Sequence, residues 1–133
     1  MAYKNCLTNK GLDIITQLMT AAGTIPKWIH WGVGTTEATV LQNALIDLTG
    51  VTEARTVGVN TQTTSVSPAV ANDTLTNTGT ITALAALAIT EYGIFDALTD
   101  GDMYSRSNFA VVNVGIGETI QFITSTTFAS YLS

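Results

Sequence analysis

The 133-residue sequence has little charge, only two prolines, one histidine and one cysteine. The single cysteine, Cys6, excludes a disulfide framework and a cluster of thiolate metal ligands. A net charge of −5, without any run of basic residues, argues against a nucleic-acid partner. The longest apolar stretches, such as residues 83–89, are far short of the roughly 20 residues that cross a bilayer. The first six residues lack the apolar core of a signal peptide, so we expect no membrane partner and synthesis in a reducing cytoplasm.

The low charge fraction is the most informative part of the composition. Only 11% of the residues are charged, whereas about 25% is usual for a soluble domain. On the roughly 6,700 Å² surface of a folded chain of this mass, that is about one charge per 450 Å². Mean hydropathy is +0.31 although threonine is abundant, so hydroxyl, amide and methyl groups must cover the remaining surface. Such a surface suits close contact with other proteins and indicates a component of an assembly rather than a free enzyme.

The N-terminal part of the sequence predicts one helix. Thr8 or Asn9 can cap its first turn, and Gly23 followed by Pro26 marks its end. Apolar residues with helical spacing lie between them, at Leu12, Ile14, Ile15, Leu18 and Met19. A second, short helical segment is predicted over residues 40–48, where apolar residues three and four apart recur at Leu41, Ala44, Leu45 and Leu48.

Most of the remaining sequence predicts short strands, with Gly58 as a bulge and Asp100-Gly101 as the strongest hairpin turn. The expected strands cover residues 28–34, 51–59, 61–66, 74–82, 87–95, 103–112 and 119–128, while residues 83–88 fit helix or strand. The predicted fold is mainly β: an antiparallel, jelly-roll-like β-sandwich of about seven to eight strands, with one N-terminal helix and the short second helical segment. We expect one domain over residues 1–133, with an N-terminal arm and helix over 1–23 and the β-sandwich over 28–128.

A row of threonines occupies one face of an expected strand. Every second residue from Thr74 to Thr82 is threonine, which makes that face β-branched and hydroxylated. Such a face fits either a solvated outer surface or a surface that pairs with another chain.

The sequence offers no catalytic, cofactor-binding or metal-binding residues that we would assign. His30 is the only histidine, and its place between Trp28 and Trp31 on a strand favours a structural or interface role over that of a general base. Cys6 has only Lys4 and Lys10 as basic neighbours in sequence, which does not indicate a reactive thiolate. The segment 32–34, Gly-Val-Gly, lacks the third glycine and the following helix of a dinucleotide loop. We therefore expect no cofactor and no enzymatic activity.

Two further groups of residues could form a binding or catalytic site or could serve structure alone. The acidic residues Glu91, Asp96, Asp100 and Asp102 could supply oxygen ligands to a cation such as Ca²⁺ or a carboxylate pair for glycoside hydrolysis, but aspartates are also common turn formers. Aromatic residues could form a sugar-stacking platform if they were exposed together, or they could fill a core or an interface: Trp28, Trp31, Tyr92, Tyr104 and Tyr131.

Several segments resemble small bacteriophage virion proteins. Residues 7–12 and 31–34 resemble the opening of phage tail-collar and tail-fibre modules, and residues 89–97, 103–109 and 117–122 resemble a pattern that recurs in small virion proteins. Together these segments cover about a quarter of the chain. In physical terms, the pattern predicts a structural scaffold in which Phe95 and Phe109 fill a core. Arg106 pairs with Glu91 or Asp96, and Glu118 is a further partner.

The resemblance implies a non-enzymatic virion structural protein. Fibre modules lead into a shaft or a receptor-binding tip, whereas this sequence ends at Ser133, which favours a capsid decoration (cement) protein that binds and stabilises the assembled head. A tail, collar or tail-fibre adaptor and a carbohydrate-binding β-sandwich adhesin are the alternatives. The implied partners are the major capsid protein or other virion proteins, together with further copies of the chain in a trimer or dimer.

The same resemblance implies a place in the virion. The outer capsid surface is favoured and the tail is the alternative, after synthesis in the host cytoplasm. The segment through Cys6 and the threonine-rich strand are the expected contact regions.

Overall fold

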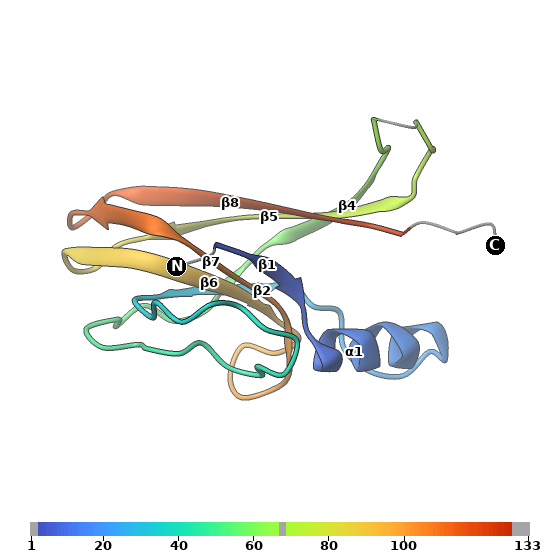
Figure 1. Cartoon of the computed structure of the whole chain (residues 1–133), viewed down its shortest axis with the longest axis horizontal. Helices are drawn as coiled ribbons and strands as arrows, with labels where there is room; N and C mark the ends of the chain where they lie inside the picture. The colour runs from blue at the N-terminus through green and yellow to red at the C-terminus, as the bar shows by residue number, and fades with distance from the viewer. Residues whose placement is uncertain (1–2, 67–68, 129–133) are drawn as a thin grey trace.

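A computed structural model describes residues 3–66 and 69–128 (Figure 1). These residues form one helix and eight strands, and every strand pair is antiparallel. The predicted mainly β architecture of antiparallel sheets with an N-terminal helix is confirmed. In chain order the elements are β1 (Asn5–Leu7), α1 (Asn9–Met19), β2 (Trp28–Gly32), β3 (Thr56–Val57), β4 (Val59–Thr63), β5 (Thr74–Thr82), β6 (Leu87–Phe95), β7 (Met103–Val114) and β8 (Thr119–Thr127).

The strands form two sheets that lie as two layers (Figure 1). The five-stranded sheet has the order β1-β7-β6-β2-β3, and the three-stranded sheet has the order β4-β5-β8. The chain passes between the sheets through residue 58, residues 83–86 and residues 115–118. Gly58 is therefore a crossing between sheets rather than the predicted bulge. A Cβ atom at this position would lie only 3.0 Å from the Asn77 side chain, so the close approach favours glycine.

The core lies between the two layers. The ring of Tyr92 from β6 stacks on that of Phe122 from β8, with centroids 4.2 Å apart, and Trp31 from β2 meets Phe122 edge-on at 6.4 Å. The Tyr92 hydroxyl hydrogen-bonds the Thr124 hydroxyl across the layers, and the Tyr104 hydroxyl donates to Thr126 Oγ1 at 3.2 Å. Aliphatic side chains complete this buried cluster: Ile14, Ile29, Ile81, Ile89, Ile94 and Val114.

Thr8 joins the helix to the five-stranded sheet. Its Oγ1 accepts a hydrogen bond from Gly11 N at 2.8 Å, which caps α1 as predicted, and donates to the carbonyl of Met103 in β7. The helix ends at Met19, four residues before the predicted stop at Gly23. Ala21 adopts a left-handed conformation with φ of 59°, and Ala22 N returns to the Gln17 carbonyl, which closes the last turn early. Among the described residues no helix has the length and apolar character needed to span a membrane.

Three further predictions about secondary structure need correction. Residues 40–48, predicted as a short helix, form turns and loop, because backbone amides of this segment donate to Glu91 instead of to one another. Residues 51–55 are not a strand, since Glu53 turns inward toward Trp31. Residues 83–86 form a bend between the layers, where Ala83 N bonds the Glu118 carbonyl at 2.8 Å. Conversely, the strand predicted at 74–82 is confirmed with its bounds as β5.

Candidate functional site

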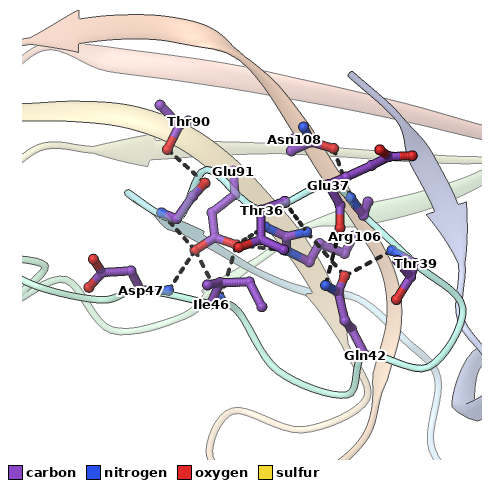
Figure 2. A network of polar contacts seen from close by, with 12 residues as sticks. Thr36, Glu37, Thr39, Gln42, Ile46, Asp47, Thr90, Glu91, Arg106 and Asn108 are labelled. Carbon is purple, nitrogen blue, oxygen red and sulfur yellow. Dashed lines mark hydrogen bonds and ion pairs between the residues drawn. The ribbon is translucent and has the colours of Figure 1, made fainter. Parts of the chain in front are cut away.

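Glu91 and Arg106 form a fully buried ion pair between the neighbouring strands β6 and β7 (Figure 2). Arg106 Nε donates to Glu91 Oε2 at 2.7 Å, and Arg106 Nη2 lies 2.7 Å from the same oxygen. Both side chains are 0% exposed. The predicted pairing of Arg106 with Glu91 is thus confirmed. The alternatives Asp96 and Glu118 are wrong, because both accept backbone amides within turns, from Asp102 and Gly115 respectively.

The loop between β2 and β3 supplies the remaining hydrogen bonds of the Glu91 carboxylate. The amides of Gly34, Ile46 and Asp47 each lie 3.0 Å from Glu91 Oε1, and Ile46 N also lies 3.1 Å from Oε2. Figure 2 shows Ile46 and Asp47 of this loop beside the carboxylate. A buried carboxylate is tolerated only when it is paired and hydrogen-bonded. Arg106 supplies the counter-ion of Glu91, and these three amides supply the remaining hydrogen bonds.

The glycines of the segment 32–34 make room for this carboxylate. A Cβ atom on Gly32 or on Gly34 would lie 2.5 Å from Glu91 Oε1, well inside van der Waals contact. The Gly-Val-Gly segment that resembles part of a nucleotide loop therefore surrounds an anion that belongs to the protein itself. No nucleotide phosphate can take this place while Glu91 occupies it.

Arg106 uses its remaining guanidinium group to fix the other half of the same loop. Nη1 donates to the Thr36 carbonyl at 2.9 Å and to Gln42 Oε1 at 3.0 Å. Gln42 Oε1 also accepts from Thr39 N, and Gln42 Nε2 donates to the Glu37 carbonyl. The network thus holds residues 34–47 against one face of the five-stranded sheet. With no exposed atom in the ion pair, its role in this arrangement is to position the loop.

A second buried carboxylate, Glu53, binds the same sheet to the crossing between β5 and β6. It is 7% exposed, and Oε1 accepts from Leu84 N at 2.7 Å while Oε2 accepts from Thr52 N at 3.1 Å. Burial acts to raise the pKa of Glu53, but the hydrogen bonds from Leu84, Trp31 and Thr52 outweigh it and leave the pKa below its ordinary 4.5.

His30, the only histidine, is half-buried, and its Nε2 lies 2.8 Å from the Glu53 carbonyl oxygen. Burial lowers the pKa of His30 below its ordinary 6.5, so the ring is neutral at pH 7 and donates to that carbonyl. The ring therefore ties β2 to the segment before β3, which agrees with the predicted structural role.

The acidic residues considered as a cation site are not brought together. Glu91 is engaged with Arg106, and Asp96 Oδ1 accepts from Asp102 N at 2.7 Å. Asp102 accepts from Asn43 at 2.9 Å, while Asp100, with φ of 53°, forms the predicted hairpin turn. Across residues 3–66 and 69–128, no three His, Cys, Asp or Glu side chains are grouped so that they could hold a metal ion. These aspartates thus act as turn formers.

The aromatic residues considered as a sugar platform mostly lie in the interior. Trp31, Tyr92 and Tyr104 are at most 7% exposed, and Trp28 is half-buried, while Tyr131 lies outside the described residues. Of the two phenylalanines expected in the core, Phe109 is partly buried beside Tyr92. Phe95 is buried on the opposite face of the sheet, where the Arg55 guanidinium lies 3.6 Å from its ring centre.

The segment through Cys6 is built into the five-stranded sheet. Residues 5–7 form β1 and pair with β7, and Cys6 Sγ donates to the Ala38 carbonyl at 3.3 Å. This half-buried thiol fastens β1 to the loop that Arg106 holds.

The outward face of the three-stranded sheet carries no charged side chain on its three strands, and we call it the hydroxyl face. Asn77, Gly79 and Ile81 of β5 point inward, so the threonines between them point outward. Thr76 Oγ1 hydrogen-bonds Thr63 Oγ1 at 2.8 Å and Ser125 Oγ at 3.1 Å, which links all three strands. By register, the face comprises Val59, Thr61, Thr63, Thr74, Thr76, Thr78, Thr80, Thr82, Thr119, Gln121, Ile123, Ser125 and Thr127.

The alternating threonines of β5 predicted one part of the hydroxyl face, but the part that β8 contributes was not predicted from the sequence. Residues 119–122 carry a related signal, because the polar residues Thr119 and Gln121 alternate with the apolar residues Ile120 and Phe122. Only the pairing of β5 with β8 shows that the two rows belong to one surface. Comparison of the chain with protein-family models, with curated proteins and with solved structures finds no match.

Proposed function

We propose that this chain is a non-enzymatic structural protein of a phage virion, and specifically a capsid decoration (cement) protein that binds and stabilises the assembled head. Its fold is proposed to be a jelly-roll-like β-sandwich in a single domain over residues 1–133. The observation that carries the function is the hydroxyl face, which spans three strands without one ionisable side chain. The major capsid protein is the proposed partner, at the outer surface of the capsid.

The chemistry of the hydroxyl face supports close contact with another protein. Removing an unpaired charge from water costs far more than removing a hydroxyl group that keeps a hydrogen-bond partner. Several hydroxyls of the face already have such partners within the sheet, as in the pair Thr74 and Thr127 at 2.9 Å. A partner can therefore cover these paired hydroxyls without leaving them unsatisfied, while the threonine methyl groups add apolar contact.

The opposite side of the molecule supports a rigid subunit. The ion pair of Glu91 and Arg106 fixes the long loop before any partner binds, so little conformational entropy remains to be lost on binding. A protein that binds the assembled shell but not its free subunits stabilises the shell by mass action. Repetition of the same contact over a capsid strengthens attachment through multivalency.

Binding to undecorated, expanded phage heads tests this function. Purified protein should cosediment with heads at micromolar concentration and raise the temperature at which they disrupt. Thr78→Lys places a charge at the centre of the hydroxyl face and should lower head binding at least tenfold, about 1.4 kcal/mol. Leu41→Lys, at a residue 82% exposed on the loop of the other layer, is the matched control and should leave head binding unchanged.

The same experiment separates the alternatives. Binding to purified tails but not to heads would replace the cement function with that of a tail, collar or tail-fibre adaptor. Retention of a glycan on an array, without binding to either particle, would favour the carbohydrate-binding adhesin. Binding to none of the three would refute a virion role.

A further inference from the structure

The four outer strands of the two sheets differ greatly in length. β1 has three residues, β3 has two and β4 has five, whereas β8 has nine. Among the described residues β8 pairs only with β5, so the backbone groups along its other side have no strand partner. Short outer strands are a usual protection against edge-to-edge association, and β8 is the one outer strand without it.

β8 also lacks the other protective features of an edge. It contains no charged residue and no proline. Its register with β5 runs through nine consecutive pairs, from Thr119 with Thr82 to Thr127 with Thr74. By contrast, β1 is preceded by the ion pair of Lys4 with Glu37, and β3 is flanked by Arg55 and Gly58. A regular, uncharged edge of this length is a template for another strand.

We propose that β8 pairs antiparallel with the β8 of a second copy of this chain, about a two-fold axis at Ile123. The two three-stranded sheets then form one continuous six-stranded sheet. This inference rests on the proposed function, since the resemblance to virion proteins implies further copies of the chain in a trimer or dimer, and it identifies that oligomer as a dimer with a defined interface.

The sequence of β8 is self-complementary about Ile123. On the outward side, Thr119 meets the partner's Thr127, and Gln121 meets the partner's Ser125. Hydroxyl pairs of this kind already join neighbouring strands in the chain itself, between Thr76 and Ser125. Ile123, 61% exposed in an otherwise polar row, meets the partner's Ile123 and so loses its exposed apolar surface.

Charge agrees with this arrangement. Glu118, the charged residue nearest to β8 in sequence, faces the partner's Phe128 in this register and not another carboxylate.

The mass of the purified protein in sedimentation equilibrium provides the first test. We expect a dimer with twice the 14.0 kDa of the chain. Ile123→Lys places two like charges across the axis and should weaken self-association at least tenfold. Thr78→Lys is the matched control, because Thr78 lies directly beside Ile123 in the sheet but on the central strand, and it should leave the dimer intact. Circular dichroism and the melting temperature of the diluted monomer establish that both variants fold.

Cysteine cross-linking tests the register. In a Cys6→Ser background, Ile123→Cys places two thiols directly opposite each other, with Cα atoms about 4.5–5.5 Å apart, a separation that permits a disulfide. Gln121→Cys in the same background is the control. Its two thiols would lie four residues apart along the strands, about 13 Å, and should not cross-link. Oxidation should therefore give a covalent dimer from the first variant alone.

A monomer at all accessible concentrations would overturn the inference, as would a dimer that survives Ile123→Lys or that cross-links equally through residue 121. These outcomes are distinct from failure of the proposed function. A monomer that still binds heads would refute the dimer but support the cement function. A β8-paired dimer that binds neither heads nor tails would support the dimer but refute the cement function.

Discussion

The two layers of the molecule use charge in opposite ways. Only two charged residues occur within the eight described strands, Glu91 and Arg106, and both lie in the five-stranded sheet and bind each other. The three-stranded sheet has none, and its outward face consists of hydroxyl, amide and methyl groups. The first layer is covered by its own chain through the loop that this ion pair holds, whereas the second is left open. The few charges of the strands thus lie on the side that stabilises the subunit, and the side that we propose as the contact surface has none.

The largest expected effect of a mutation is at the buried ion pair. Arg106→Met leaves the Glu91 carboxylate buried without its counter-ion, and such changes cost about 3–5 kcal/mol of the free energy of unfolding. Urea denaturation at pH 7 measures this loss. The double variant Glu91→Gln with Arg106→Met removes the uncompensated charge and should recover part of the stability. If Arg106→Met were as stable as the original protein, the buried ion pair would not be what stabilises the five-stranded layer.

A smaller loss is expected where the loop approaches Glu91 most closely. Gly34→Ala adds a Cβ atom 2.5 Å from Glu91 Oε1 and 2.6 Å from Ile46 Cβ, so the loop must shift. Overpacking of this kind costs about 1–3 kcal/mol. Gly115→Ala is the control, because its Cβ would meet nothing closer than 3.6 Å. Comparison of the two melting temperatures should show a marked drop for residue 34 alone.

The five-stranded layer should also determine the response to acid. Hydrogen bonds hold the pKa of Glu53 below its ordinary 4.5, so the folded state binds fewer protons than the unfolded state in that range. The stability that Glu53 contributes is therefore complete above pH 4.5 and is lost as the pH falls toward the folded-state value. Glu53→Gln should flatten this part of a profile of unfolding free energy against pH. An unchanged slope below pH 4.5 would contradict the assignment.

The smallest effect is expected on the hydroxyl face. Thr80 is exposed, and Thr80→Val keeps the β-branched shape, so the free energy of unfolding should change by about 0.5 kcal/mol or less. Thr76→Val should cost slightly more, because the Thr76 hydroxyl bonds both Thr63 and Ser125. Thermal denaturation of both variants measures the difference. A large loss at residue 80 would mean that this face serves stability and not contact.

The sequence predicted best those features that depend on neighbouring residues. Alternation predicted the bounds of β5, Thr8 was one of the two expected helix caps, and residues 100–101 form the expected turn. The loop over residues 40–48 was missed, because its leucine spacing favours a helix and nothing local reveals a buried carboxylate. The free energy gained when the amides of Ile46 and Asp47 bind Glu91 outweighs the helical preference of this segment.

The candidate sites show the same limit of prediction from neighbouring residues alone. The partner of Arg106 was predicted among three acidic residues, but the enclosure of Glu91 by Gly32 and Gly34 depends on segments far apart in the sequence. Likewise, the threonine row of β5 was seen, whereas the full hydroxyl face required the pairing with β8.

The way Glu91 is enclosed also has a consequence for the order of folding. Arg106 is only 15 residues from Glu91, so these two groups can meet as soon as β6 and β7 form a hairpin. The amides of Ile46 and Gly34 are 45 and 57 residues away from Glu91, and closing such long segments is slow. We expect the hairpin and its ion pair in the transition state and the loop to dock afterwards. Kinetic φ-values should accordingly be high near β6 and β7 and close to zero around Ile46.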